Sequence, residues 1–357
     1  MSKVAVIGAG KTGRGFLGRL LKEAGDEIVF IDKNQQLVDE LNEEGFFYVN
    51  FFGNEKKPLK IDHFKAYTWE NVSFSELELI LVSVGGRNLE DVGQCLARQL
   101  NDDKNYYVIT CENASHPSEI LRKAIHKSNV FISEATVFCT TTEAKGTDIV
   151  SENYPCLQYD VELLNGYIPN TRQIKPVENF SNFLTRKLYT YNAASCVIAY
   201  LGWLKGYTDY AKAANDPEIQ RLLDENYQVT NRVLCEEFGY EKEDQEEFAL
   251  LSRKKFCDST IQDTISRNAR EPQRKLESSE RIIGPIRLLY KYGECAEVLE
   301  KTAAAAILYR TDDDDEWRNI QKEKSPEQIL IDICGLNPQE EAFSNILRYV
   351  RIFQEVL

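Results

Sequence analysis

VAVIGAGKTGRGF, residues 4–16, is the most informative segment of the chain. An apolar run typical of a buried strand leads into the spacing G-x-G-x-x-G, made by Gly8, Gly10 and Gly13. In this pattern the first glycine permits a tight turn, the second lets the backbone approach a pyrophosphate, and the third lets a helix pack on the strand. The start of that helix offers free N–H groups and a positive dipole end to phosphates. The segment therefore predicts a dinucleotide site that also includes Lys11 and Thr12.

The second predicted strand, residues 27–31, indicates which dinucleotide binds. It ends at Asp32, nineteen residues after Gly13. A carboxylate at this place accepts hydrogen bonds from ribose hydroxyls and repels a 2′-phosphate, so we predict NAD rather than NADP as the cofactor. Lys33 leaves an opening for a 2′-phosphate. The alternative is a strand–turn–helix unit that binds no nucleotide.

Further apolar runs at 3–7, 78–84, 106–110 and 130–133 predict more strands of a parallel sheet. Ligands of such sheets bind beyond the carboxyl ends of the strands. Gly85 follows one of these runs, and Glu112 and Asn113 follow another, so we assign all three to the cofactor site. The aromatic- and lysine-rich segment 46–72 is expected to be a β excursion from the sheet.

Past about residue 185 the strand-like runs give way to helical periodicity. The predicted helices are 192–212, 217–238, 244–256, 279–292, 294–309, 326–334 and 338–355. The predicted fold class is therefore an α/β Rossmann domain, residues 1–185, followed by an all-α domain, residues 186–357. The acidic run 312–316 is interpreted as a solvated loop, with a cation site as the alternative.

Composition excludes several classes of protein. The formal net charge of −14 argues against a nucleic-acid partner, because phosphate backbones require an excess of Lys and Arg. No run approaches the roughly 18 apolar residues that cross a bilayer, and the first strand begins too early for a signal peptide. Nine scattered cysteines without a C-x-x-C pair fit a reduced, cytoplasmic protein. No histidine follows His126, so we expect no metal site.

Lys187 and Asn192 are the candidate chemical groups of the second domain. Asn192 is placed to cap the apolar helix that follows it, and Lys187 lies in the approach or the first turn. A lysine in a dry cleft acts as a general base near neutral pH once its pKa is lowered. The alternatives are a surface lysine and a simple cap.

The chain resembles the polyol-specific long-chain dehydrogenases, and within that family the short mannitol-1-phosphate 5-dehydrogenases. The resemblance covers nearly the full length. The segments that carry it are 8–16, 32–35, Cys111-Glu112-Asn113, 200–202, the arginine-containing signature 270–285, 303–310 and 334–336.

The family's catalytic motif is K-x4-N-x2-H, which falls here on Lys187, Asn192 and Ser195. The resemblance implies that Lys187 takes the alcohol proton and that Asn192 binds the reacting oxygen. Ser195 replaces the family's histidine; it still offers a hydrogen bond, but it cannot carry charge. Glu134 stands where the family has an asparagine near the same oxygen, and a carboxylate there opposes a developing alkoxide.

The resemblance implies NAD-dependent interconversion of a sugar alcohol, or its phosphate, and the keto sugar, in a cleft between the two domains. The changes at Ser195 and Glu134 leave two alternatives open: a divergent paralogue for another sugar derivative, and a nucleotide-binding protein with little catalytic activity. Seven basic residues are candidates for binding the phosphate of a substrate: Arg253, Lys254, Lys255, Arg267, Arg270, Arg274 and Lys275. The expected partner is a small-molecule substrate, with no nucleic acid or membrane, for a cytoplasmic monomer or small homo-oligomer.

Overall fold

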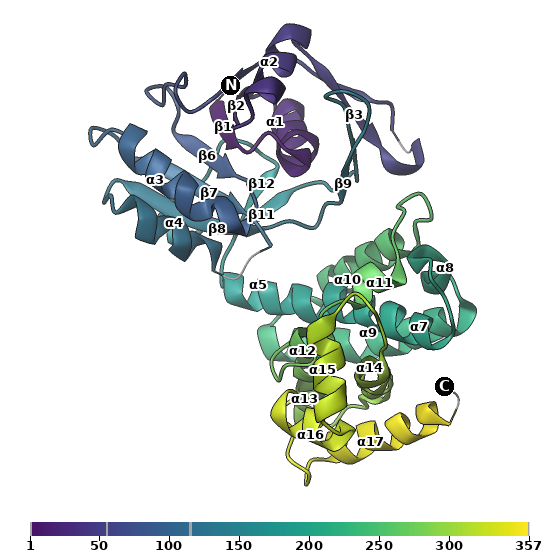
Figure 1. The fold of residues 1–357 in the computed structure, drawn as a ribbon. Coiled ribbons are helices and arrows are strands. Elements are labelled where there is room, and N and C mark those ends of the chain that lie inside the picture. The colour runs from purple at the N-terminus through teal and green to yellow at the C-terminus, as the bar shows by residue number, and fades with distance from the viewer. Residues whose placement is uncertain (1, 55, 114–115, 356) are drawn as a thin grey trace. The chain divides into compact units, whose positions relative to one another are not determined.

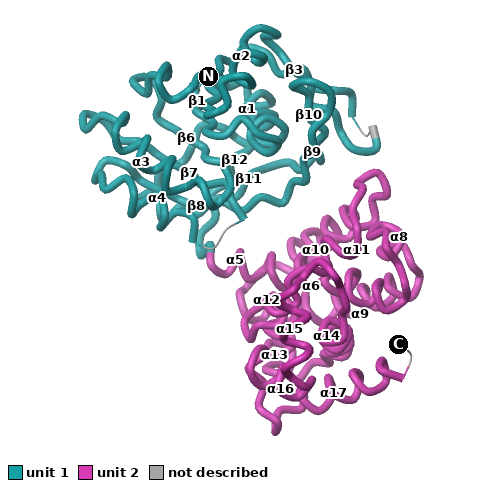
Figure 2. The backbone as a smooth tube through the Cα atoms, viewed as in Figure 1, with its two compact units in different colours: residues 1–180 teal, residues 181–357 magenta. Residues whose placement is uncertain are grey.

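The computed structural model describes residues 2–54, 56–113, 116–355 and 357. The chain forms two compact units, Met1–Phe180 (unit 1) and Ser181–Leu357 (unit 2) (Figure 2). Unit 1 is an α/β Rossmann-type unit and unit 2 is largely helical, so the predicted fold class is confirmed. The division lies at the start of helix α5, Phe180–Lys187, a few residues before the boundary expected at 185.

Unit 1 is built on an eight-stranded sheet with the order β12-β11-β8-β7-β6-β1-β2-β5. The six strands from β8 to β5 are all parallel, whereas β11 runs antiparallel to β8 and parallel to β12. The strands are β1 (Lys3–Ile7), β2 (Glu27–Ile31), β5 (Phe64–Tyr67), β6 (Leu79–Val82), β7 (Tyr106–Cys111), β8 (Val130–Thr136), β11 (Leu157–Asp160) and β12 (Ile174–Val177).

The strand order reverses next to β1. The chain leaves β1 toward β2 and β5, and then returns to the other side of β1 with β6, β7 and β8. This is the doubly wound dinucleotide-binding order, in which the crevice opens where the order reverses. The carboxyl ends of β1 and β6 therefore mark the place where a ligand of unit 1 is expected.

The parallel strands are buried on both faces, as their continuous apolar runs predicted. Val4 and Val6 pack with the first helix, which comprises the π-helical stretch η1 (Gly13–Gly18) and α1 (Arg19–Ala24). Ala5 and Ile7 belong to the opposite core, with α3 (Leu89–Gln99) and α4 (Pro117–Ile125). Figure 1 shows α3 and α4 side by side on their face of the sheet. The β1 backbone is thus held rigidly from both sides.

The segment 46–72 fits the expected β excursion only in part. β3 (Phe47–Phe51) and β4 (Leu59–Ile61) join β9 (Thr141–Glu143) and β10 (Ile149–Ser151) in a second sheet, ordered β4-β3-β10-β9. β5, however, pairs with β2 and is an edge strand of the main sheet. The remaining helical elements of unit 1 are α2 (Gln35–Glu44) and the short 3₁₀ turns η2 (Phe52–Asn54), η3 (Gly86–Asn88) and η4 (Glu162–Leu164).

Unit 2 begins with one continuous helical segment from Phe180 to Leu204. It is divided into α5, η5 (Leu188–Asn192), α6 (Ala193–Cys196), η6 (Val197–Leu201) and α7 (Gly202–Leu204), and both η stretches are π-helical. The other helices are α8 (Tyr210–Ala214), α9 (Pro217–Phe238), α10 (Lys242–Cys257), α11 (Ile265–Ala269), α12 (Pro272–Lys275), α13 (Ile283–Lys291), α14 (Glu297–Leu308), α15 (Asp315–Glu323), α16 (Pro326–Asp332) and α17 (Glu341–Gln354).

The core of unit 2 surrounds α14. Its residues 303–306 are four consecutive alanines with no exposed surface, and small side chains allow close helix packing. α14 packs against α17, η6, α13 and α9. The helices predicted at 217–238 and 294–309 are confirmed closely. The first begins with a proline, and the second is an alanine-rich segment with glutamates in its first turn; both are strong local signals for a helix.

One predicted helix of unit 2 has wrong bounds, and the acidic run is a loop only in part. The helix expected over 192–212 begins twelve residues earlier, at Phe180, and ends at Leu204; the chain then turns before α8. The acidic run 312–316 is a loop over residues 312–314, as predicted, but Asp315 and Glu316 already belong to α15. Asp314 caps this helix by accepting the Trp317 N–H at 2.9 Å. Among the described residues, no group of three or more His, Cys, Asp or Glu is arranged to hold a metal ion.

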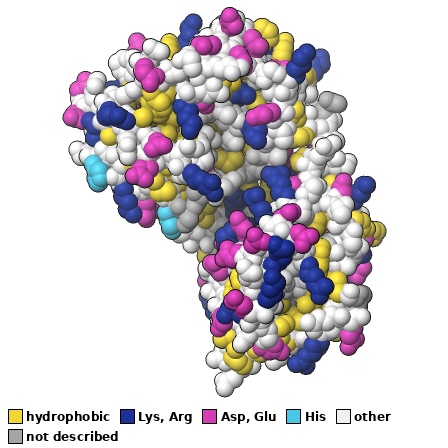
Figure 3. All heavy atoms as spheres, in the orientation of Figure 1, with side chains coloured by type: hydrophobic (Ala, Val, Ile, Leu, Met, Phe, Trp, Pro, Cys, Tyr) yellow, Lys and Arg dark blue, Asp and Glu magenta, His cyan; other side chains and the backbone are white. Residues whose placement is uncertain are grey.

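Acidic and basic side chains are interspersed on the face shown in Figure 3, so the negative net charge is not gathered in one area there. Across the described part of the chain, no helix combines the length and the apolar character that crossing a membrane requires.

The start of α9 generates a prediction about stability. Asp216 caps this helix and also accepts hydrogen bonds from Lys205 Nζ and Tyr207 Oη, both at 2.8 Å. Burial alone would raise the pKa of Asp216, but these bonds and the Ile219 N–H lower it to about 2. Its contribution to stability is therefore present above the ordinary pKa of 3.8 and is lost as the pH falls toward 2.

We expect Asp216→Ala to lower the free energy of unfolding at pH 7 by about 2 kcal/mol, because it removes a charged cap. The difference from the parent protein should shrink between about pH 4 and pH 2. Ser325→Ala, which removes the neutral cap of α16, is the matched control and should show a deficit that does not change with pH. Urea unfolding at several pH values measures both; a constant Asp216→Ala deficit would contradict the assignment.

Candidate functional site

Packing alone requires two of the three glycines in the first turn. Gly8 has a φ of +95°, and a Cβ there would lie 2.1 Å from the Ser83 carbonyl oxygen. A Cβ on Gly13 would lie 1.9 Å from the carbonyl oxygen of Gly8. Any side chain at either position would thus collide with backbone, and the turn is pressed against the end of β6 where the strand order reverses.

Gly10 differs, because a Cβ there would meet no protein atom within 4 Å. The protein itself therefore gives no reason for a glycine at this exposed position. A ligand that approaches the backbone closely does give one, as the pyrophosphate of a dinucleotide would. Lys11, which is exposed, and Thr12, which is half-buried, follow at the start of the helix. The turn thus fits a bound dinucleotide.

The Arg14 side chain holds this turn in place by hydrogen bonds to backbone carbonyls, a role that the sequence did not predict. Its side chain is buried; Nη1 donates to the Ala9 carbonyl, and Nε donates to the Thr147 carbonyl at 3.2 Å. Burial lowers the pKa of the Arg14 guanidinium. The only sequence signal was an arginine within a stretch of otherwise small or apolar residues.

Asp32 lies at the end of β2 and binds the same turn. Its Oδ2 accepts the Ala9 N–H at 2.8 Å, and its Oδ1 accepts the Asn34 N–H at 2.9 Å. Each carboxylate oxygen keeps acceptor capacity for ribose hydroxyls. Lys33 Nζ donates to Asn88 Oδ1 at 3.3 Å, so its amine is engaged beside the end of β6.

Glu112 shapes the neighbouring strand end. Its Oε1 accepts the N–H groups of Val84 and Gly85, at 2.6 and 2.8 Å. Burial raises the pKa of Glu112, while these two bonds act in the opposite direction. Gly85 has a φ of +81°, a conformation that favours glycine. Glu112 therefore fixes the loop after β6, and Asn113 follows it as an exposed residue.

Glu134 lies in β8, next to β7 in the sheet. Its Oε2 accepts from the Ser118 hydroxyl at 2.9 Å and from the Ser118 N–H at 3.4 Å. Ser118 belongs to the first turn of α4, where free N–H groups and the helix dipole stabilise a negative charge. One oxygen of the Glu134 carboxylate is therefore bound within unit 1.

The first helix of unit 2 carries Lys187, Asn192 and Ser195. Asn192 has helical backbone angles, and its side chain makes no cap hydrogen bond, so the predicted cap is wrong: the helix has already run for three turns. Lys187 is accordingly the last residue of α5 rather than part of an approach. The apolar periodicity of 193–203 hid this earlier start.

The π-helical stretch η5 determines how these three residues face. In an α-helix, residues five apart differ by about 140° around the axis. In η5 the Ala193 N–H donates to the Leu188 carbonyl five residues earlier, so the turn is wider than that of an α-helix. Lys187 and Asn192, five residues apart, therefore come toward one side. Ser195 follows Asn192 by three residues in α6, which places these two as neighbours on the helix surface.

The amine of Lys187 lies in dry and cationic surroundings. Burial, with the positive charges of Lys255 and Arg281, lowers the pKa of Lys187 from 10.5 to about 7. Lys255 belongs to the last turn of α10, and Arg281 to the signature 270–285. Neither was assigned this role from the sequence, because they lie 68 and 94 residues further along the chain.

The signature 270–285 packs directly on this helix. A Cβ on Gly284 would lie 2.3 Å from the hydroxyl oxygen of Tyr189, two residues after Lys187. Lys275 is also buried, with its Nζ donating to the Asn268 carbonyl, and burial lowers its pKa to about 8. A second lysine of lowered pKa thus ties α11 to α12, and the charge of Arg281 lowers the pKa of both Lys187 and Lys275.

Ser195 is half-buried and accepts a hydrogen bond from the Tyr210 hydroxyl at 3.0 Å.

Three of the basic residues that the sequence offered for binding a phosphate are paired with carboxylates: Arg253 with Asp224, Arg267 with Asp263, and Arg274 with Glu271.

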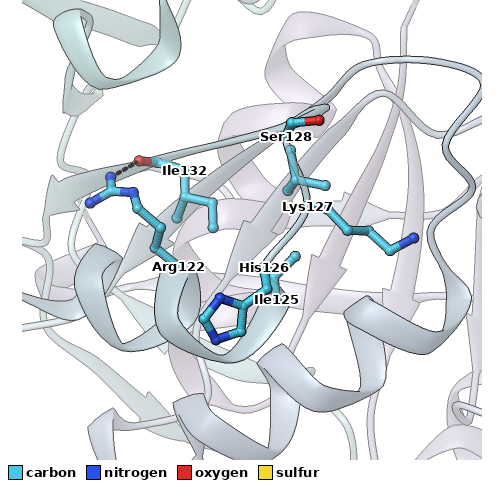
Figure 4. Close-up of a pocket in the computed structure, with 7 residues that line it drawn as sticks. Arg122, Ile125, His126, Lys127, Ser128 and Ile132 are labelled. Carbon is cyan, nitrogen blue, oxygen red and sulfur yellow. Dashed lines mark hydrogen bonds between the residues drawn. The ribbon is translucent and has the colours of Figure 1, made fainter.

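A pocket with a volume of about 260 Å³ lies elsewhere in unit 1, between the end of α4 and the start of β8. Figure 4 shows Arg122, His126 and Lys127 around it, with Arg122 donating to the Ile132 carbonyl. It adjoins the first residue of β8, at the amino end of the strand. None of the predicted site residues lines it.

Comparison with known proteins agrees with this architecture. The family model described as mannitol dehydrogenase Rossmann domain matches residues 2–144, and the one described as mannitol dehydrogenase C-terminal domain matches residues 179–356. The chain is 28% identical to the mannitol-1-phosphate 5-dehydrogenase of Bacillus pumilus, over 97% of this chain and 99% of that protein. It is 26% identical to that of Oceanobacillus iheyensis, over 99% of both.

Solved structures share the fold. The mannitol 2-dehydrogenase of Pseudomonas fluorescens, in a ternary complex with NAD and D-mannitol, superposes with a TM-score of 0.62 at 14% identity, over 99% of this chain and 91% of that chain. A substrate-free D-sorbitol dehydrogenase gives a TM-score of 0.77 at 12% identity, over 99% of this chain and 93% of that one.

The two kinds of glycine in the turn generate one prediction. Gly10→Ala should leave the melting temperature unchanged but weaken dinucleotide binding by about tenfold or more, about 1.4 kcal/mol. Gly13→Ala is the contrasting variant and should destabilise the fold by about 1–3 kcal/mol through overpacking. NADH fluorescence titration and thermal unfolding separate the effects. A destabilised Gly10→Ala protein, or one with unchanged affinity, would contradict the assignment.

The charges around Lys187 generate a second prediction for this site. Lys255→Met removes a positive charge that lowers the pKa of Lys187, so that pKa should rise. The matched control is Lys254→Met, its exposed neighbour on α10, which should leave the value unchanged. Acylation of Lys187, followed by mass spectrometry across pH, measures the midpoint without any need for turnover. Equal midpoints in the two variants would show that Lys255 does not act on this amine.

Proposed function

The chain belongs to the mannitol dehydrogenase family, and on that premise we propose that it is an NAD-dependent oxidoreductase that interconverts a polyol, or a polyol phosphate, and the corresponding keto sugar. The observation that carries the proposal is the Lys187 amine. Its pKa of about 7 makes it a base at neutral pH, on the same side of the helix as Asn192 and Ser195.

Each of these side chains has one role in the reaction. The neutral Lys187 amine takes the proton of the substrate hydroxyl. Asn192 donates from its amide to the reacting oxygen, and Ser195 donates from its hydroxyl. In the reverse direction the protonated Lys187 returns the proton to the oxygen. Positioned donors of this kind stabilise the charge that develops on the oxygen, and losing one typically costs about 10²–10³ in rate.

The cofactor is assigned to residues of unit 1. The turn from Gly8 to Gly13 and the start of its helix, with Lys11 and Thr12, would hold the pyrophosphate, and Asp32 would hold the adenine ribose. Gly85, Glu112 and Asn113 at the neighbouring strand ends complete the proposed site. Bound NAD would supply the acceptor for a hydride. A carboxylate at Asp32 repels a 2′-phosphate, which supports NAD over NADP.

An anionic substrate is favoured by the charges around Lys187. Lys255 and Arg281 both act on its amine, and Arg281 Nε is already paired with Glu280 Oε2 at 2.8 Å. A phosphate would add a negative charge beside Lys255 and Lys187. The curated relatives named above are mannitol-1-phosphate 5-dehydrogenases. We therefore rank polyol phosphates ahead of free polyols as substrates.

A second candidate function is supported by Ser195 and Glu134, which by the resemblance stand where the family has a histidine and an asparagine. A dehydrogenase for another sugar derivative, for instance a sugar acid or an amine-bearing sugar, would use a differently shaped polar shell. The remaining alternative is a protein that binds the nucleotide but has little catalytic activity. A substrate screen distinguishes these candidates from the leading proposal.

The direct test is turnover of the purified protein with NAD and NADP against polyols, polyol phosphates and sugar acids, followed by absorbance of the reduced cofactor. We expect NAD-dependent oxidation of a polyol phosphate, with a rate that rises with pH through about 7 as the Lys187 amine loses its proton. Lys187→Met should lower kcat by about 10²–10⁴ and leave NAD affinity unchanged.

Thermal unfolding provides the control for Lys187→Met. A lysine whose pKa is lowered in the folded state destabilises that state below its ordinary pKa of 10.5, so the variant should be at least as stable as the parent. A folded variant that keeps more than about a tenth of the parent's activity would place proton transfer elsewhere. Turnover of sugar acids alone would favour the second candidate.

A further inference from the structure

Ser195 uses its hydrogen differently from three threonines in the helices of unit 2. Thr185, Thr230 and Thr302 each donate to the backbone carbonyl four residues earlier, at 3.0, 2.7 and 2.8 Å. This is the ordinary bond of Ser and Thr within helices. Ser195 makes no such bond within the described residues; its recorded partner there is Tyr210, from which it accepts.

A hydroxyl that accepts one hydrogen bond still has its own hydrogen to donate. The Tyr210 hydroxyl donates to Ser195 Oγ at 3.0 Å, which occupies one lone pair and restricts how the Ser195 hydroxyl rotates. The hydrogen of Ser195 then points away from Tyr210. A half-buried serine of this kind is prepared to donate to a ligand, on the side of the helix that carries Asn192.

Tyr210 is fixed well enough to orient its partner. It is the first residue of α8, whose cap Asp209 accepts the Lys212 N–H at 2.8 Å. The Tyr210 N–H donates to the Asp263 carbonyl at 3.1 Å. The ring packs edge-on against Phe256, with 5.9 Å between the ring centroids, and the side chain is 5% exposed.

The hydroxyl of Tyr210 is also a constant donor. Burial raises its pKa well above the ordinary value of 10, although the bond to Ser195 acts in the opposite direction. Tyr210 therefore stays protonated over the whole range in which Lys187 titrates. The direction of the hydrogen bond, from Tyr210 to Ser195, does not reverse in that range.

We infer that Tyr210 is a positioning residue for Ser195, and that the two hydroxyls in series present one neutral donor to the substrate oxygen bound by Asn192. This inference rests on the proposed function. It gives a physical account of Ser195, which by the resemblance stands where the family has a histidine: the shorter side chain is oriented by a buried tyrosine from α8. The pair donates without taking up charge, so proton transfer is left to Lys187 alone.

A double-mutant cycle tests the inference in the full-length protein. Tyr210→Phe removes one oxygen and keeps the ring, whereas Ser195→Ala removes the donor itself. We expect Tyr210→Phe to lower kcat about 3- to 10-fold, the range of a typical net hydrogen bond. In the Ser195→Ala background the same change should alter kcat less than about twofold, because nothing remains to be oriented.

Binding and stability measurements separate a positioning role from a structural one. NADH affinity, measured by fluorescence, should be the same in the parent and in Tyr210→Phe. The cycle repeated on thermal unfolding without nucleotide should show coupling between the two hydroxyls, since it reports the bond itself. Tyr227→Phe is the matched control: it breaks another buried Tyr–Ser pair, with Ser252 at 2.6 Å, and should leave kcat unchanged.

The outcomes are distinguishable. Turnover in the parent with additive effects of Tyr210→Phe and Ser195→Ala on kcat would overturn the positioning role while the proposed function stands. Equal losses of kcat in Tyr227→Phe and Tyr210→Phe would also overturn it, because the effect would then be one of general packing. A parent protein that turns over no substrate in the screen would overturn the proposed function, and this role with it.

Discussion

The π-helical turn Leu188–Asn192 is the constraint on which the candidate site depends. A regular α-helix would turn Lys187 and Asn192 about 140° apart, and the two could not serve one oxygen atom. The wider turn brings them to the same side, and the return to α-helix places Ser195 beside Asn192. π-Helical turns are rare and frequently lie at functional sites. The helix is therefore locally less stable than an unbroken α-helix, but it places these side chains together.

The pKa of Lys187 depends on residues that lie outside its own helix. Burial disfavours its charged form, and Lys255 and Arg281 add positive charge that disfavours it further. Both neighbours come from segments packed on the same helix, α10 and the signature 270–285. The tight approach of Gly284 to Tyr189 keeps that signature against the helix. The arginine-containing signature thus supplies both packing and charge to the site.

The sequence predicted those features that are encoded locally. The turn from Gly8 to Gly13 and the strands before and after it were found because glycine spacing and apolar runs report backbone geometry directly. The start of the helix at Phe180 was missed because its apolar stripe, Phe180, Phe183 and Leu184, is short and is separated by polar residues from the apolar run at 193–203. The π-helical turn leaves no mark on apolar periodicity, and the neighbours Lys255, Arg281 and Tyr210 are distant in sequence or carry no motif. Residues that orient or charge a catalytic group are therefore found only once tertiary packing is known.

A crystal structure with NADH and a sugar alcohol or its phosphate tests the central claim most directly. The account predicts that Lys187 Nζ, the Asn192 amide and Ser195 Oγ all lie within hydrogen-bond distance of a single oxygen atom of the substrate, with the Tyr210 hydroxyl still bonded to Ser195. A substrate bound away from this side of the helix, or one whose reacting oxygen contacts Asn192 but not Lys187, would contradict it.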